Sequence, residues 1–126
     1  MKKIEIAKSV RSPYVCFDPE KGSIVVRGQS ILENPREFFE ALVGRWLDEY
    51  LKAPQEETNV EIDLEFCNTS SSVWIFQLLN KVSKLRLSGK NVKIFWVYAD
   101  DDVLDIGNDY SQCIGMEFLM VKKVAA

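Results

Sequence analysis

The residues best suited to chemistry lie in one short segment, residues 67–72, which reads Cys-Asn-Thr-Ser-Ser-Ser. It joins an alternating apolar and charged run to a helical pattern. A side-chain amide or hydroxyl at such a junction accepts hydrogen bonds from the free N–H groups of the first helical turn. One cap needs only one such side chain, and Ser and Thr are mediocre helix formers. The excess of hydroxyls leaves two interpretations open, helix capping and a functional hydroxyl.

Phosphorylation suits the chemistry of this position, and Thr69, Ser70 and Ser71 are the candidate acceptors. A phosphoryl group adds about −1.5 to −2 charges at pH 7. The free N–H groups and the positive end of the helix dipole favour that charge, so the fold should survive. A partner docking there would have to bury a hydrated dianion, which is costly. The segment therefore suits an on/off switch, although the residues alone do not choose among the hydroxyls.

The helix expected after this segment carries two different faces. Its core face is apolar and comprises Ile75, Leu78, Leu79, Val82 and Leu85. A second stripe, spaced by four, three and four residues, consists of Thr69, Val73, Phe76 and Asn80. At about 100° per residue this stripe points well away from the core face. An exposed Phe and Val below a hydroxyl are typical of a contact surface, unless a loop or the first helix covers Phe76.

Several function classes are disfavoured by what the chain lacks. The 126 residues include no His, so Ser-His-Asp and Cys-His catalysis and His-based metal sites are excluded. The net charge of −3 argues against a nucleic-acid partner. The longest apolar run, Ile94 to Ala99, is too short to span a bilayer. We expect a non-enzymatic protein without a cofactor or metal, in contact with neither nucleic acid nor membrane.

The cysteines and the aspartates have ordinary interpretations. The chain opens without an apolar export signal, so its three cysteines indicate reduced thiols in the cytoplasm. Cys67 precedes the hydroxyls but has no His to act as a base, which favours a structural residue. Asp100–Asp102, with Asp105 one turn later, lack the Gly and the terminal Glu of a calcium loop. Acidic residues at a helix start are favoured by the dipole in any case.

The elements that must position these residues follow from periodicity and turn chemistry. Residues 13–17 and 23–27 flank the turn residues 18–22 and predict a hairpin. A helix is expected from the cap Asn34 and Pro35 to Leu51. We predict strands at 2–7, 13–17, 23–27, 59–66, 91–99 and 116–121, and helices at 35–51, 69–87 and 100–112. This order predicts a single α/β domain, residues 1–126, with a mixed sheet, an N-terminal antiparallel hairpin and about three packed helices.

Two motifs resemble a known family. They are Glu33-Asn34-Pro35-Arg36-Glu37-Phe38-Phe39 and the junction Leu64-Glu65-Phe66-Cys67-Asn68-Thr69-Ser70-Ser71. From about Tyr14 to Met120 the chain is similar to the SiaC-type bacterial regulatory phosphoproteins. The fold of that family resembles the STAS domains of anti-sigma factor antagonists, with Asn68 where STAS-like proteins carry Asp.

The resemblance implies a signalling switch. It implies that Thr69 is phosphorylated by a kinase of the partner-switching type and restored by a PP2C-type phosphatase. It also implies that the unphosphorylated form binds and activates a diguanylate cyclase, which links the chain to cyclic-di-GMP and biofilm. Asn68, Val73, Phe76 and Asn80 are then the expected partner contacts.

A second hypothesis belongs to another class. The helix start at Asn68–Ser72 would serve as an anion site in a small-ligand or nucleotide-binding domain. That function requires a concave pocket at these residues, lined by groups from Asp100 to Asp105.

Overall fold

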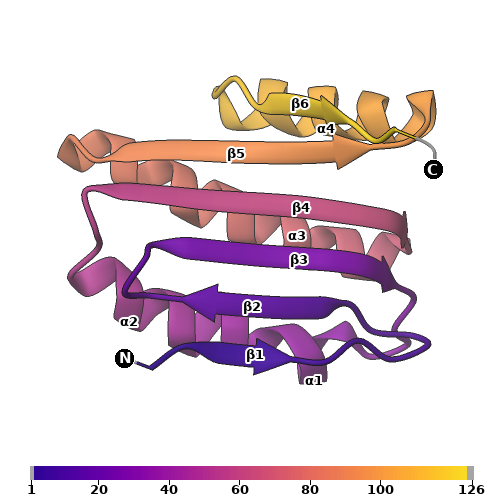
Figure 1. The fold of residues 1–126 in the computed structure, drawn as a ribbon, viewed down its shortest axis with the longest axis horizontal. Helices are drawn as coiled ribbons and strands as arrows, with labels where there is room; N and C mark the ends of the chain where they lie inside the picture. Colours follow the sequence, from indigo (N-terminus) through magenta and orange to yellow (C-terminus); the bar gives the residue numbers. More distant parts are fainter. Residues whose placement is uncertain (1, 125–126) are drawn as a thin grey trace.

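The computed structural model describes residues 2–124, which form a six-stranded sheet. Its strands lie side by side in the order of the sequence (Figure 1). The strands are β1 (Ile4–Ile6), β2 (Tyr14–Asp18), β3 (Ser23–Ser30), β4 (Glu57–Cys67), β5 (Asn91–Tyr98) and β6 (Leu119–Lys122). The pairs β1–β2 and β2–β3 are antiparallel, and the three remaining pairs are parallel. The predicted mixed sheet with its N-terminal hairpin is confirmed.

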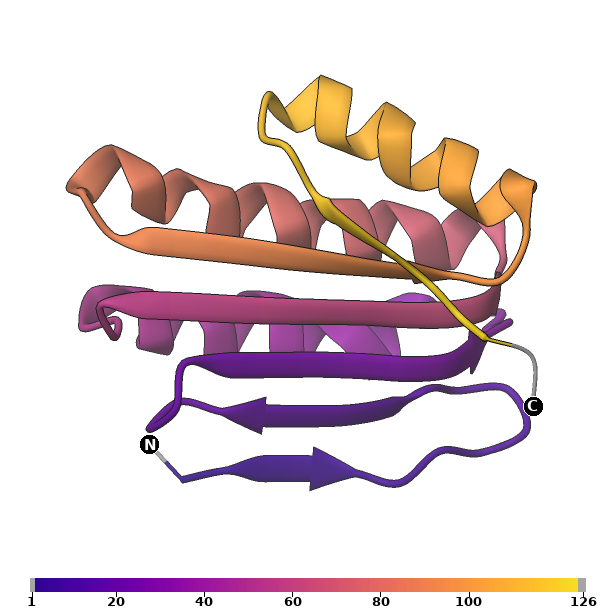
Figure 2. The same cartoon turned by 45° about the horizontal axis from the view of Figure 1, so that its top comes forward.

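All helices lie on one face of this sheet, and the other face is open (Figures 1 and 2). Each parallel connection advances in the same direction, and crossovers of one hand then place their helices on the same side. The helical segments are α1 (Pro35–Phe39), the π-helix η1 (Glu40–Trp46), α2 (Leu47–Lys52), α3 (Thr69–Ser83), the 3₁₀-helix η2 (Lys84–Ser88) and α4 (Asp101–Ile114). The three helical connections, one for each crossover, therefore cover the core in a single layer (Figure 1), and the predicted set of about three helices packed on the sheet is confirmed.

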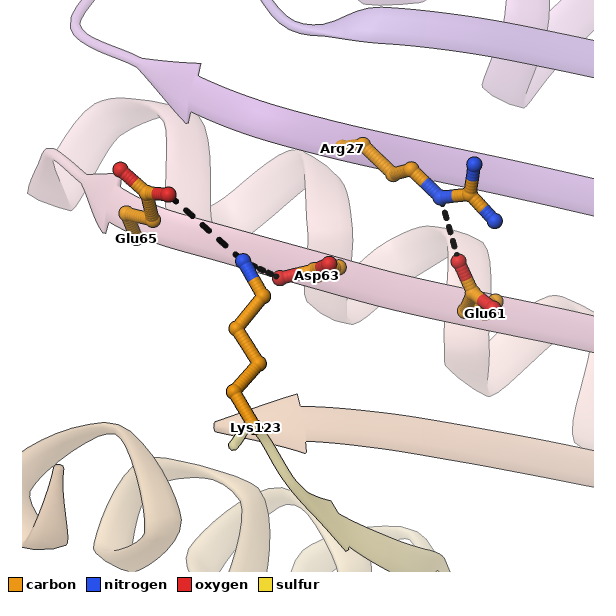
Figure 3. A network of polar contacts seen from close by, with 5 residues as sticks. All are labelled: Arg27, Glu61, Asp63, Glu65 and Lys123. Atoms are coloured by element: carbon orange, nitrogen blue, oxygen red, sulfur yellow. Dashed lines mark hydrogen bonds and ion pairs between the residues drawn. The ribbon is translucent and has the colours of Figure 1, made fainter. Parts of the chain in front are cut away.

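The central strand β4 shows how the two faces differ. Val60, Ile62 and Leu64 are buried under the helices. The alternating carboxylates point to the open face, where two basic residues meet them (Figure 3). Arg27 Nε lies 2.7 Å from Glu61, and Lys123 Nζ lies 2.9 Å from Asp63 and 3.6 Å from Glu65. Lys123 thereby ties the segment after β6 back across the sheet to β4.

The first helical segment departs from the regular α-helix that the sequence predicts. Its apolar residues come in pairs every four positions, at 38–39, 42–43, 46–47 and 50–51. In an α-helix a four-residue repeat turns away from the core by about 40° at each step. The wider π-turns of η1 keep these pairs facing the sheet. Lys81 Nζ donates to the Val43 carbonyl oxygen in this stretch, at 2.7 Å.

The ends of the helices are only partly as predicted. Pro35 begins α1, but the side chain of Asn34 makes no capping hydrogen bond, contrary to expectation. Asp100 does cap α4, accepting a hydrogen bond from the Val103 N–H at 3.0 Å. Gly89 ends η2 with φ of +81°, a left-handed conformation that favours glycine.

Candidate functional site

Asn68 fixes the start of α3 through both ends of its side-chain amide. Its Oδ1 accepts a hydrogen bond from the Ser71 N–H at 3.0 Å, which is the N-cap interaction. Its Nδ2 donates to the Leu32 carbonyl oxygen at 2.9 Å. Asn68 thus ties the helix start to the loop between β3 and α1. Its part in this candidate site is to position the helix, and direct contact with a partner stays a prediction.

The hydroxyl side chains after Asn68 have different environments, which the sequence could not distinguish. Ser71 is fully buried and its Oγ accepts a hydrogen bond from the Ser30 hydroxyl at 2.8 Å. Ser72 donates its hydroxyl to the Thr69 carbonyl oxygen at 2.7 Å. Thr69 and Ser70 are exposed. Ser70 makes only two long contacts of 3.5 Å, and within residues 2–124 no hydrogen bond involves the Thr69 hydroxyl. Ser71 is therefore a structural residue and a poor phosphate acceptor.

The Ser71→Ala variant tests this structural role. It should lower the free energy of unfolding by about 1–3 kcal/mol, because the Ser30 hydroxyl stays buried without a partner. The double variant Ser30→Ala/Ser71→Ala should lose less than the two single variants together. Ser70→Ala, at an exposed hydroxyl, is the control and should change stability by less than about 0.5 kcal/mol. Urea unfolding followed by circular dichroism measures all four, and equal losses in Ser70→Ala and Ser71→Ala would contradict the assignment.

The predicted stripe on α3 is only partly exposed. Val73 keeps 52% of its surface exposed. Phe76 is half-buried, because the Tyr110 ring of α4 packs on it edge to face with the ring centroids 5.3 Å apart. Asn80 is half-buried as well. Of the two alternatives for Phe76, an exposed and a covered side chain, the structure shows a partly covered one, and Tyr110 of α4 supplies a contact that sequence reasoning did not consider.

A groove of about 460 Å³ runs between the start of α3 and the face of α4, at the carboxyl ends of β4 and β5. Thr69 and Ser72 line it from α3. The pocket required by the second hypothesis therefore exists, with Asp100 and Asp102 in its wall, although Asp105 is not among the lining residues. Its apolar lining is formed by Leu64, Phe66, Ile75, Trp96, Val103 and Ile106.

Phe66 and Tyr110 are site residues that sequence reasoning missed. Phe66 pairs with Gln29 after a register shift that skips Glu65, so strict alternation breaks at this end of β4, and the side chain of Phe66 keeps 66% of its surface exposed. Tyr110 donates its hydroxyl to the Ser72 carbonyl oxygen at 3.3 Å and packs on Trp96. The aromatic character of Tyr110 was visible in the sequence, but its contact with α3 depends on how α4 packs.

The electrostatics of the groove oppose an anionic ligand. Its lining includes Glu65, Asp100, Asp102 and Asp109, and neither Lys nor Arg. Negative charges repel a phosphate or nucleotide, most strongly where solvent is partly excluded. Burial raises the pKa of the Cys67 thiol to about 11, so the thiol stays protonated at neutral pH and is a poor nucleophile. Across residues 2–124, no three His, Cys, Asp or Glu side chains gather to hold a metal ion.

Comparison with known proteins decides the family. The model of the family described as SiaC family regulatory phosphoprotein matches residues 6–123. This chain belongs to the SiaC family. The resemblance expected from the two motifs is thereby confirmed. SiaC proteins are regulatory phosphoproteins, so the expectation of a non-enzymatic protein is confirmed as well.

Several relatives from Pseudomonas aeruginosa resemble this SiaC family member over nearly its whole length. An uncharacterised protein of strain UCBPP-PA14 is 22% identical over 120 residues, which are 94% of each chain. The crystal structure of apo-SiaC has a TM-score of 0.85 at 21% identity and covers 98% of this chain and 100% of its own. SiaC crystallised with the diguanylate cyclase SiaD, of which it is the activator, has a TM-score of 0.87 at 20% identity, covering 95% and 99%. These structures share the fold with this chain.

Within the part of the chain that the structure describes, no helix is both long and apolar enough to cross a bilayer.

Proposed function

We propose that this SiaC family member is a cytoplasmic signalling switch in which reversible phosphorylation of Thr69 controls partner binding. A kinase of the partner-switching type adds the phosphoryl group, and a PP2C-type phosphatase removes it. The unphosphorylated form binds an effector, for which a diguanylate cyclase is the leading candidate. The relative SiaC of Pseudomonas aeruginosa, an activator of the diguanylate cyclase SiaD, supports this choice of effector.

The observation that carries the proposal is the environment of the Thr69 hydroxyl. It is exposed at the N-terminus of a fifteen-residue helix and lines the groove. No hydrogen bond within residues 2–124 has to break before it reacts. The N–H groups of the first turn of α3 and the helix dipole favour the phosphoryl charge, so modification leaves the fold in place. Val73, Phe76 and Asn80, with Asn68 beside Thr69, supply the partner surface.

Site mapping by mass spectrometry tests the proposed acceptor. We expect protein purified from its native host to carry one phosphoryl group, located on Thr69. The Thr69→Ala variant should lack that group, whereas Ser70→Ala and Ser71→Ala should keep it. A phosphoryl group that persists in Thr69→Ala, or that disappears in Ser70→Ala instead, would move the switch to another residue.

A further inference from the structure

The α4 side of the groove presents charge around an apolar side chain. Asp102, Ile106 and Asp109 are spaced by four and three residues, so they share one face of α4, and all three line the groove. Ile106 keeps 44% of its surface exposed. The two carboxylates lie seven residues apart, or about 10 Å along the helix axis. A partner therefore meets an apolar contact between two negative charges.

The carboxylates of Asp102 and Asp109 are not neutralised by the fold, unlike the two other carboxylates that line the groove. Glu65 has Lys123 at 3.6 Å, and Asp100 is used as the cap of α4. In contrast, the side chains of Asp102 and Asp109 have neither an ion-pair nor a hydrogen-bond partner within residues 2–124. The groove is thus apolar in its depth and negative at its α4 wall. Complementarity requires an occupant that is apolar at its tip and positive around it.

We propose that the groove between α3 and α4 binds a basic amphipathic helix of the effector protein. An apolar side chain of that helix enters between Phe66 and Ile106, and two Lys or Arg residues seven positions apart pair with Asp102 and Asp109. Helices that place one face in an apolar groove are a recurring mode of recognition. The proposal rests on the proposed function for its premise that the Thr69 end of α3 is a docking surface, and it adds the chemistry of the partner.

This arrangement separates two contributions to binding. The carboxylates at the rim attract a basic partner over a distance, which affects mainly the association rate and its dependence on salt. The apolar contact in the groove is made only on docking, and it sets how slowly the complex dissociates. A phosphoryl group on Thr69 lies at the border of that contact. The phosphoryl group weakens binding because it holds water at the apolar contact, although it also adds negative charge.

A synthetic peptide is the probe, titrated into the unphosphorylated ¹⁵N-labelled protein. The peptide is an Ala-rich helix of about fifteen residues with two Arg residues seven positions apart and one Leu between them. We expect its amide chemical-shift changes to concentrate in residues 64–69 and 100–110. One twin peptide has Glu in place of Arg and a second has Ser in place of Leu, and both should bind at least about tenfold more weakly.

Matched variants of the protein complete the test. Asp102→Asn/Asp109→Asn should weaken the peptide about tenfold and flatten its salt dependence. Glu37→Gln/Glu40→Gln, which removes the same charge from exposed residues of α1 and η1, should change affinity less than about twofold. Equal weakening by both pairs, shifts centred elsewhere, or equal binding of the Glu peptide would overturn the proposal. The test uses only unphosphorylated protein. A negative result would therefore not contradict the Thr69 switch, and evidence against the switch would not contradict peptide binding in the groove.

Discussion

The Thr69→Asp variant should lose about a hundredfold in affinity for the effector while keeping its fold. The added carboxylate lies at the border of the apolar contact, where a docked partner would have to remove its hydration water. A penalty of about 3 kcal/mol for that dehydration corresponds to the hundredfold loss. The same carboxylate is favourable at the start of a helix, by about 0.3–1 kcal/mol, so stability should not fall.

A paired experiment measures both parts of this result. Wild-type and Thr69→Asp baits are compared in pulldowns from native lysate, and the effector that the wild type retains is then titrated by calorimetry. Thr69→Ala should remain competent to bind and should not respond to the kinase. Gln77→Glu places the same additional charge on an exposed position two turns further along α3 and should bind like the wild type. If Thr69→Asp unfolds, or if both baits retain the same proteins with equal affinity, Thr69 does not gate this surface.

Replacing Gly107 by Ala is expected to cost about 3 kcal/mol in the free energy of unfolding. Gly107 is buried in α4 directly against the Trp96 ring, and a Cβ at this position would overlap the ring. Trp96 cannot move freely, because its Nε1–H donates to the Val103 carbonyl oxygen at 2.9 Å. It is also packed against Tyr110 and Phe118. The helix must therefore shift away from β5, and the groove widens with it.

Gly44→Ala is the matched control for Gly107→Ala. A Cβ added at Gly44 would meet open space. Because Ala is a better helix former than Gly by up to about 1 kcal/mol, this variant should be neutral or more stable. Denaturant unfolding followed by far-ultraviolet circular dichroism compares the two. Equal stability of Gly107→Ala and Gly44→Ala would show that α4 adapts to the added methyl group at no cost.

The sequence predicted those features that depend on neighbours along the chain. Strict alternation identified β4 and its two faces, and the polar segment after it located the start of α3. A cap within residues 67–72 was predicted because an N-cap is a local interaction, and the structure assigns that cap to Asn68. These patterns, with the two family motifs, were sufficient for the fold class and for choosing Thr69 as a candidate.

Features that depend on distant residues escaped sequence reasoning. Ser71 is buried, and its hydrogen-bond partner Ser30 lies forty-one positions away in the sequence. Phe76 is covered by Tyr110 of α4, and no periodicity within α3 reveals that contact. The π-helix was missed for another reason. Its four-residue apolar repeat was visible, but it was interpreted as the broad face of an α-helix.

The sequential order of the strands has a consequence for how the chain folds. Every strand pairs with its neighbours in the sequence, so each pairing closes only one hairpin or one crossover loop. The entropy of closing a loop grows with its length, so a parallel pairing through a crossover forms more slowly than an antiparallel pairing through a short turn. We therefore expect the hairpin of β2 and β3 to form first and β4, β5 and β6 to join it in turn. Thr69 directly follows β4, so its hydroxyl would take its place when β4 pairs with β3, before β5 and the edge strand β6 have joined.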